Sequence, residues 1–108
     1  MSAGNINREL SPVPGGFGQL NLTAASQDFT ALVGAFAWGA TVIGGATRVL
    51  VSVSGNPAVM RMDGTAPTAA IGHVLPVGYN QVWEGEWLRQ AKWINQAGVA
   101  VLSVQLLN

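Results

Sequence analysis

Cysteine is absent from this chain of 108 residues, and charged residues are scarce. Without thiols, neither a disulfide framework nor a thiolate metal site is available. Charged side chains make up 9% of the residues, well below the share in an average globular protein, and the five basic and five acidic residues cancel. Soluble monomers usually keep a mixed-charge surface and a net charge away from zero. A neutral, charge-poor chain is typical of a subunit that packs against other subunits.

Clusters of positive charge are missing as well. The basic residues are scattered, and only Arg89 and Lys92 lie close together, next to Glu84 and Glu86. Nucleic-acid binding draws its affinity from clustered Lys and Arg side chains that neutralise phosphates. Nucleic acid is therefore not an expected partner.

Amphipathic helices of useful length are also lacking, but one uncharged run has to be tested as a membrane span. The run from Phe29 to Thr47 contains four glycines and too few large aliphatic residues for favourable insertion into a bilayer. We therefore expect no membrane span. Instead we expect a strand over Asp28–Val33, a loop from Gly34 to Gly39 and a buried strand over Ala40–Ile43.

Alternation of apolar and polar residues dominates the rest of the chain, which is the period of a half-buried strand. In Thr47–Val53 three valines alternate with other residues, and Ser54–Pro57 has the composition of a turn, so Thr47–Met62 is predicted to be a hairpin. Further strands are expected at the following segments: Phe17–Leu22, Ala58–Met62, Gly72–Leu75, Gln81–Leu88, Ala91–Asn95 and Val99–Leu107.

This succession of short strands predicts the fold class. About seven or eight strands, separated by turn signals every 8–12 residues or so, indicate an all-β antiparallel sandwich of jelly-roll or Greek-key type. Residues 1–16, rich in Asn, Pro and Gly, have no strand or helix period and are expected to form an extended N-terminal arm that reaches a neighbouring subunit. Residues 17–108 are expected to form a single domain.

The segment from Ala58 to Val77 contains the clearest turn. Asp63 and Gly64 follow an alternating run, and this pair favours a tight turn because Gly accepts positive φ and Asp bonds to the backbone that follows it. Pro67 holds the residue before it extended. Asp63, Gly64 and Pro67 are therefore predicted to be structural turn residues.

Catalytic and metal-binding groups are not recognisable. A calcium ion at Asp63 would need more oxygens than Thr65 and Thr68 supply. His73 is the only histidine and has no carboxylate beside it in sequence, so we expect an ordinary strand residue. No catalytic, metal or cofactor residue is predicted, and the chain is not expected to be an enzyme.

Paired carboxylates and numerous tryptophans offer two further hypotheses. Glu84 and Glu86 are expected on one strand face, at a separation comparable to that of the carboxylates in retaining glycosidases. Two neighbouring side chains of one strand do not flank a glycosidic bond, so we expect them to pair with Arg89 or Lys92 instead. The four tryptophans are Trp38, Trp83, Trp87 and Trp93. They favour core or subunit contacts, with a carbohydrate-stacking platform as the alternative.

The ordered series TRVLVSVSG, AVMRMDGTAPTAAIGHVLPVG, VWEGEWLRQAKWINQAG and VAVLSVQLLN resembles small virion structural proteins of tailed bacteriophages. The resemblance covers roughly residues 47–108 and implies a non-enzymatic capsid decoration (cement) protein. The alternatives are a tail or head-to-tail junction subunit and a carbohydrate-binding module for host attachment. Implied partners are the major capsid protein, other virion subunits and copies of the chain itself. The interface residues expected for this role are Pro12, Pro14, Phe17, Trp38, Trp83 and Trp87.

Overall fold

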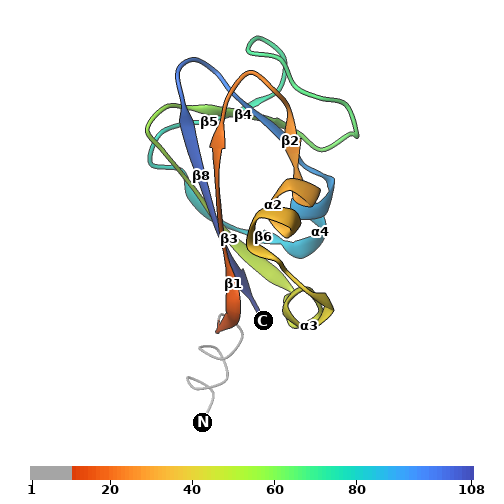
Figure 1. The fold of residues 1–108 in the computed structure, drawn as a ribbon. Coiled ribbons are helices and arrows are strands. Elements are labelled where there is room, and N and C mark those ends of the chain that lie inside the picture. Colours follow the sequence, from red (N-terminus) through yellow and green to blue (C-terminus); the bar gives the residue numbers. More distant parts are fainter. Residues whose placement is uncertain (1–10) are drawn as a thin grey trace.

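The computed structural model describes residues 11–108, which form eight strands and three short helices. The strands are β1 (Pro12–Leu22), β2 (Gln27–Asp28), β3 (Arg48–Ser54), β4 (Ala58–Arg61), β5 (His73–Leu75), β6 (Asn80–Glu84), β7 (Lys92–Asn95) and β8 (Ala100–Leu107). The helices are α2 (Phe29–Phe36), α3 (Ala40–Gly44) and α4 (Gly85–Gln90), which gather on one side of the molecule (Figure 1).

The strands form two antiparallel four-stranded sheets, with the orders β1-β8-β3-β6 and β2-β7-β4-β5. The strands pair in nested order along the chain: β4 pairs with β5, β3 with β6, β2 with β7 and β1 with β8. The doubled ribbon is then wrapped so that β3 also pairs with β8 and β4 with β7. This is the topology of a jelly roll. The predicted all-β antiparallel sandwich is confirmed.

The core lies between the sheets and follows the alternation predicted from the sequence. Val49, Val51 and Val53 of β3 face inward, as do the alternate residues of β8 from Ala100 to Leu106. Trp93 of β7 is the largest fully buried side chain. Because each buried aliphatic or aromatic side chain contributes about 1.5–3 kcal/mol, these inward rows are the main source of the fold's stability.

The predicted hairpin over Thr47–Met62 is wrong, because its two strands belong to different sheets. β3 pairs with β6 and β8, whereas β4 pairs with β5 and β7. The turn between them exists, with Gly55 at φ +80°. It carries the chain across the sandwich instead of folding it back along the same sheet.

The predicted strands at Asp28–Val33 and Ala40–Ile43 are also wrong, because helices α2 and α3 occupy these positions. Asp28 accepts a hydrogen bond from the Thr30 N–H (3.1 Å) and so caps the start of α2. A Cβ atom at Gly18 of β1 would lie 2.9 Å from Trp38 Cζ2 and 3.1 Å from Leu32 Cδ2. The glycine therefore allows α2 and Trp38, which lies two residues beyond the end of α2, to pack closely on β1. No helix within residues 11–108 is long and apolar enough to cross a membrane.

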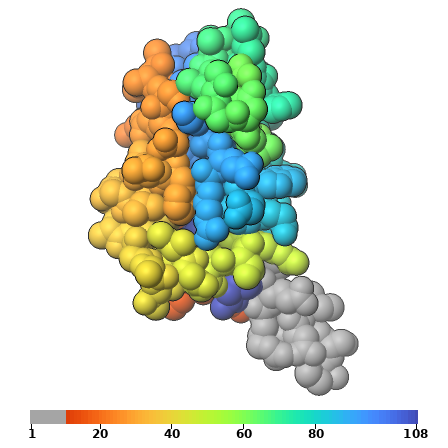
Figure 2. Space-filling view, turned by 90° about the vertical axis from the view of Figure 1, so that its right-hand side faces the viewer, coloured from red at the N-terminus to blue at the C-terminus, as the bar shows by residue number. Residues whose placement is uncertain are grey.

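Two predicted boundaries change. Residues 12–16 of the expected arm belong to β1, with an irregular register between Pro12 and Phe17; residues 1–10 lie outside the described part. The predicted strand Gln81–Leu88 ends at Glu84, and the chain then turns into α4. Figure 2 shows the helical side, where the segment from α2 to α3 (orange to yellow) lies against the blue segment that carries α4.

Candidate functional site

The outer face of the first sheet, which points away from the core, contains a row of exposed apolar side chains. The cross-strand register aligns Phe17 of β1 with Gln105 of β8, Gln105 with Leu50 of β3, and Leu50 with Val82 of β6. Phe17 is 49% exposed, Leu50 36% and Val82 44%. We call Phe17, Gln105, Leu50 and Val82 the apolar row. It crosses all four strands, a span of about 15 Å at the usual strand spacing.

Gln105 is the one polar member of the apolar row, and its amide is turned toward the backbone. Its Nε2 donates hydrogen bonds to the carbonyl oxygens of Val13 (3.4 Å) and Leu106 (3.1 Å). Its side chain is only partly exposed. The amide therefore does not interrupt the row as a free polar group would.

Polar rows border the apolar row. On one side Ser52 lies between Ser103 and Asn80, and the Gln19 amide donates to the Ser103 hydroxyl (2.9 Å). On the other side Arg48 pairs with Glu84 at 3.8 Å. These two are the only charged residues on this face among those that the structure describes, and their opposite charges cancel. The face is neutral, with an apolar centre and polar edges, as at many protein interfaces.

The predicted interface residues separate into two groups. Pro12, Pro14 and Phe17 are exposed on β1, and the Phe17 ring contacts Phe36 edge-on with centroids 6.4 Å apart. Trp87 of α4 is 46% exposed. These residues are accessible to a partner.

Trp38 and Trp83 are core residues, so their assignment to an interface is a correction. They are only 3% and 2% exposed. The Trp83 indole N–H donates to the Tyr79 hydroxyl (2.8 Å), and its ring lies 6.5 Å from that of Trp87. Because Trp83 is buried, the two-tryptophan sugar platform is reduced to Trp87 alone.

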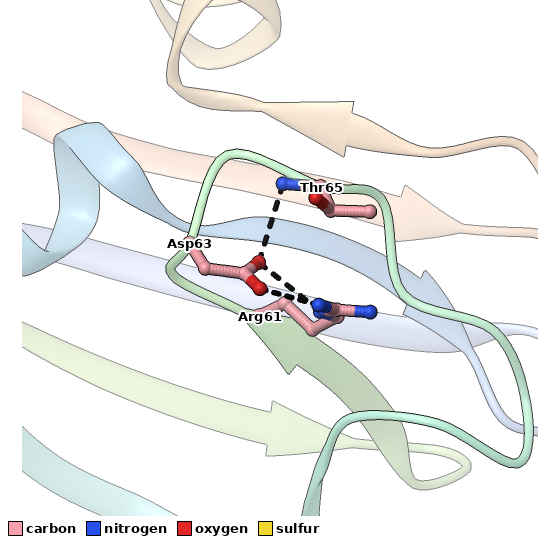
Figure 3. Close-up of polar contacts among 3 residues, drawn as sticks. All are labelled: Arg61, Asp63 and Thr65. Carbon is pink, nitrogen blue, oxygen red and sulfur yellow. Dashed lines mark hydrogen bonds and ion pairs between the residues drawn. The ribbon is translucent and has the colours of Figure 1, made fainter.

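Asp63 forms a local hydrogen-bonded turn with its neighbours (Figure 3). The carboxylate accepts hydrogen bonds from the Thr65 N–H (3.2 Å) and from Arg61, which it also pairs with electrostatically. Two hydrogen bonds lower the pKa of Asp63, and the bond from Arg61 has a larger effect than the bond from the Thr65 N–H. The Asp63 carboxylate in turn raises the pKa of Arg61. Gly64 has φ +84°, the conformation for which a glycine was predicted.

The loop that Asp63 opens folds over the outer face of the second sheet. A Cβ at Gly72 would lie 2.5 Å from Val59 Cγ1 and 3.2 Å from Pro67 Cβ, so the loop lies directly on β4. Pro67 is buried there, and Val59 and its register partner Ile94 are buried although both face away from the core. Pro67 is thus part of the packing between the loop and β4. The loop covers the second sheet, whereas the apolar row on the first sheet stays exposed.

The other candidate groups are dispersed. His73 is exposed at the start of β5, and Glu86 pairs with Arg89 (3.3 Å) in α4 while Glu84 pairs with Arg48 across the sheet. Within residues 11–108 there is no group of three or more His, Asp or Glu side chains suited to hold a metal ion.

Leu50 and Val82 are members of the row that sequence reasoning did not single out. Each is an apolar residue on the polar side of an alternating strand. Leu50 lies on the same strand face as Arg48 and Ser52, and Val82 lies on the same strand face as Glu84. That signal was present in the sequence. Their alignment was not, because it depends on β3 lying between β8 and β6.

Fold and surface together define a jelly-roll sandwich with a neutral, partly apolar sheet face. Comparisons of the chain with protein families, with curated proteins and with solved structures found no match.

Proposed function

We propose that this protein is a non-enzymatic structural subunit of a tailed-phage virion, and that it decorates and cements the capsid through the outer face of its first sheet. The observation that carries the proposal is the apolar row on a face whose only described charges, Arg48 and Glu84, are paired. Such a face loses little charge hydration when it is covered. The resemblance of residues 47–108 to virion proteins supplies the class of partner.

The mechanism is the burial of a small apolar surface that is repeated many times. Phe17, Leu50 and Val82 each contribute a modest contact. On a symmetric shell the same contact recurs at every site, and a subunit that bridges two shell proteins gains from effective concentration. The shell is then stabilised by the number of contacts and not by the strength of any one of them.

A charge placed in the apolar row tests this mechanism. Leu50→Asp puts a carboxylate in the middle of the row, and we expect it to weaken binding to purified capsids by about tenfold or more, equivalent to at least about 1.4 kcal/mol per site. Ser54→Asp is the matched control, because Ser54 lies on the same strand and face but is exposed outside the row. Cosedimentation of labelled protein with capsids measures both, and unfolding midpoints show that the variants remain folded. Equal binding by the two variants would exclude this face.

Copy number per particle separates decoration from the alternative site at the tail or head-to-tail junction. Decoration requires hundreds of copies, whereas a junction ring contains about six to twelve. Quantitative mass spectrometry of purified particles gives this number. A count in the low tens or below would move the proposal from shell to junction.

Trp87 supports a second candidate, a glycan contact for host attachment. Its exposed ring borders an open depression lined by Thr47, Glu84, Glu86 and Arg89, and jelly rolls are also found in lectins. An aromatic ring beside polar groups fits a sugar. Binding on a glycan array that disappears in a folded Trp87→Ala variant would favour this candidate, and a blank array for the native chain would remove it.

A further inference from the structure

Each of the two sheets has two edges, and an edge strand exposes backbone groups that can pair with another chain. The edges are β1 and β6 in the first sheet and β2 and β5 in the second. Natural proteins usually block such edges with short strands, prolines, bulges, lysines or covering segments.

Three of the four edges are blocked in these ways. β1 begins with Pro12 and Pro14 and has an irregular register before Phe17, and α2 packs closely against it at Gly18. β2 has two residues and runs directly into α2. β5 has three residues and is followed at once by Pro76.

β6 has none of these protections. Its sequence, Asn80–Glu84, contains no proline and no lysine, pairs with β3 in an unbroken register, and is exposed at every residue except Trp83. Alternate residues bond to β3, as shown by the Val53 N–H donating to the Tyr79 carbonyl (3.0 Å) at one end of the ladder. At the other end the Gly85 N–H donates to the Thr47 carbonyl (3.0 Å).

These bonds determine which backbone groups of β6 are left. In an antiparallel ladder the residues between bonded pairs direct their N–H and C=O groups away from the partner strand. Those residues are Asn80, Val82 and Glu84. Glu84 is also the N-cap of α4, so its carbonyl oxygen accepts the first bond of that helix. The N–H and C=O groups of Asn80 and Val82 and the N–H of Glu84 point outward from the sheet edge.

We propose that two copies of this chain pair through β6, antiparallel about a two-fold axis at Val82, and so join their first sheets into one continuous sheet. In this register Val82 faces Val82 of the second copy, and Asn80 faces Glu84 of the second copy on either side. Val82 then exchanges both backbone hydrogen bonds with Val82 of the second copy, and the Glu84 N–H of each copy donates to the Asn80 carbonyl of the other. Shifting one strand by a single residue would place the outward groups opposite residues that are bonded to β3, so no ladder would form.

Side chains fit the same register. Glu84 meets a neutral amide and not a second carboxylate, and the two Val82 side chains contact each other at the axis, so no like charges are opposed. Val77, 55% exposed just before β6, and Trp87, 46% exposed just after it, lie toward opposite ends of the strand. Antiparallel pairing brings the Val77 end of one copy to the Trp87 end of the other.

The paired dimer would also lengthen the apolar row. Val82 is the last member of the row at the β6 edge, so pairing at Val82 places the rows of the two copies end to end across the axis. The dimer is a self-complementary two-fold assembly of the commonest kind. It does not depend on the proposed virion function, because it is a property of the isolated chain.

A single cysteine tests the pairing directly, because the native chain has none. In the proposed dimer the two copies of Val82→Cys bring their Cα atoms about 5.5 Å apart, within the range that a disulfide spans. Val99→Cys is the matched control, since Val99 is a similarly exposed valine (50%) outside every strand. Under mild oxidation at about 10 µM protein we expect Val82→Cys to cross-link at least about tenfold faster, because pairing holds its thiols at a far higher effective concentration. Equal rates would overturn the proposal.

Charge exchange at the axis supplies a second test that does not depend on cross-linking. Val82→Lys and Val82→Glu each place like charges opposite each other, so each variant alone is expected to be monomeric by analytical ultracentrifugation at concentrations where the native chain is dimeric. Mixing the two variants is expected to restore a dimer containing one copy of each. A monomeric native chain, or variants that self-associate as the native chain does, would refute pairing at β6.

The two proposals can fail separately. Loss of capsid binding in Leu50→Asp with an intact dimer would leave the pairing standing. A native monomer that still binds capsids would refute the pairing alone.

Discussion

Substituting Gly72 by alanine should be among the most damaging single-methyl additions in the loop over the second sheet. The added Cβ would lie 2.5 Å from Val59 Cγ1 and 3.0 Å from the Met60 carbonyl oxygen. Val59 is 1% exposed and cannot move into solvent. Overpacking of this kind costs about 1–3 kcal/mol. The backbone adds to this cost, because φ at Gly72 is +147° and strained conformations cost about 1–3 kcal/mol each. The expected loss is therefore about 2–6 kcal/mol.

Gly64→Ala is the matched control within the same loop. Gly64 also has positive φ, +84°, but a Cβ there would meet no atom within 4 Å. Only the left-handed backbone is then disfavoured, at about 1–2 kcal/mol. Urea unfolding followed by tryptophan fluorescence reports both free energies of unfolding, with equal m-values as the check that the unfolded states are comparable.

The difference between the two variants isolates the contact with Val59. A double variant, Gly72→Ala with Val59→Ala, should recover part of the loss, because the shorter side chain makes room for the new methyl group. If Gly72→Ala cost no more than Gly64→Ala, the loop would not lie on β4 as described.

Three further outcomes are expected. Leu32→Ala, at a fully buried position of α2, should lower the free energy of unfolding by about 2–5 kcal/mol in a urea titration. Tyr79→Phe should cost about 1–2 kcal/mol in the same assay, since it leaves the Trp83 indole N–H without its acceptor. The folded pKa of Asp63 lies below its ordinary value of 3.8, so its bond to Arg61 stabilises the turn above that pH and is lost as the pH falls through the folded pKa. An NMR titration should show a depressed midpoint that rises toward 3.8 in Arg61→Gln.

Strands with strict alternation were predictable from sequence because their pattern is local. Three inward valines identified β3, and four alternate apolar residues identified β8. The turn at Asp63 was predictable for the same reason, since Asp and Gly act on the backbone next to them. Local patterns of this kind do not specify which strands become neighbours.

What could not be predicted depends on contacts between distant residues. The helix α2 is a run of apolar and small residues without a helical stripe, and it is fixed by the Asp28 cap and by packing on Gly18. The turn at Gly55 is compatible with a hairpin and with a crossing between sheets, and pairing of β3 with β8 selects the crossing. The apolar row is likewise a product of register. Its members are spread from Phe17 to Gln105 in the sequence and meet only in the folded sheet.

The nested pairing of the strands, from β4 with β5 to β1 with β8, has a consequence for the order in which the chain folds. β4 and β5 are separated by one loop, whereas β1 pairs with β8 so that Leu22 meets Ala100. Because the entropy lost on closing a loop grows with its length, the innermost pair closes at the lowest cost, and the outer pairs follow. During synthesis β1 emerges first, but its partner strand β8 emerges last. Until β8 has emerged, Leu20 and Leu22 have no β8 to pack beside, so β1 waits longest for its partner of the described strands and is the most exposed to misassociation on the ribosome.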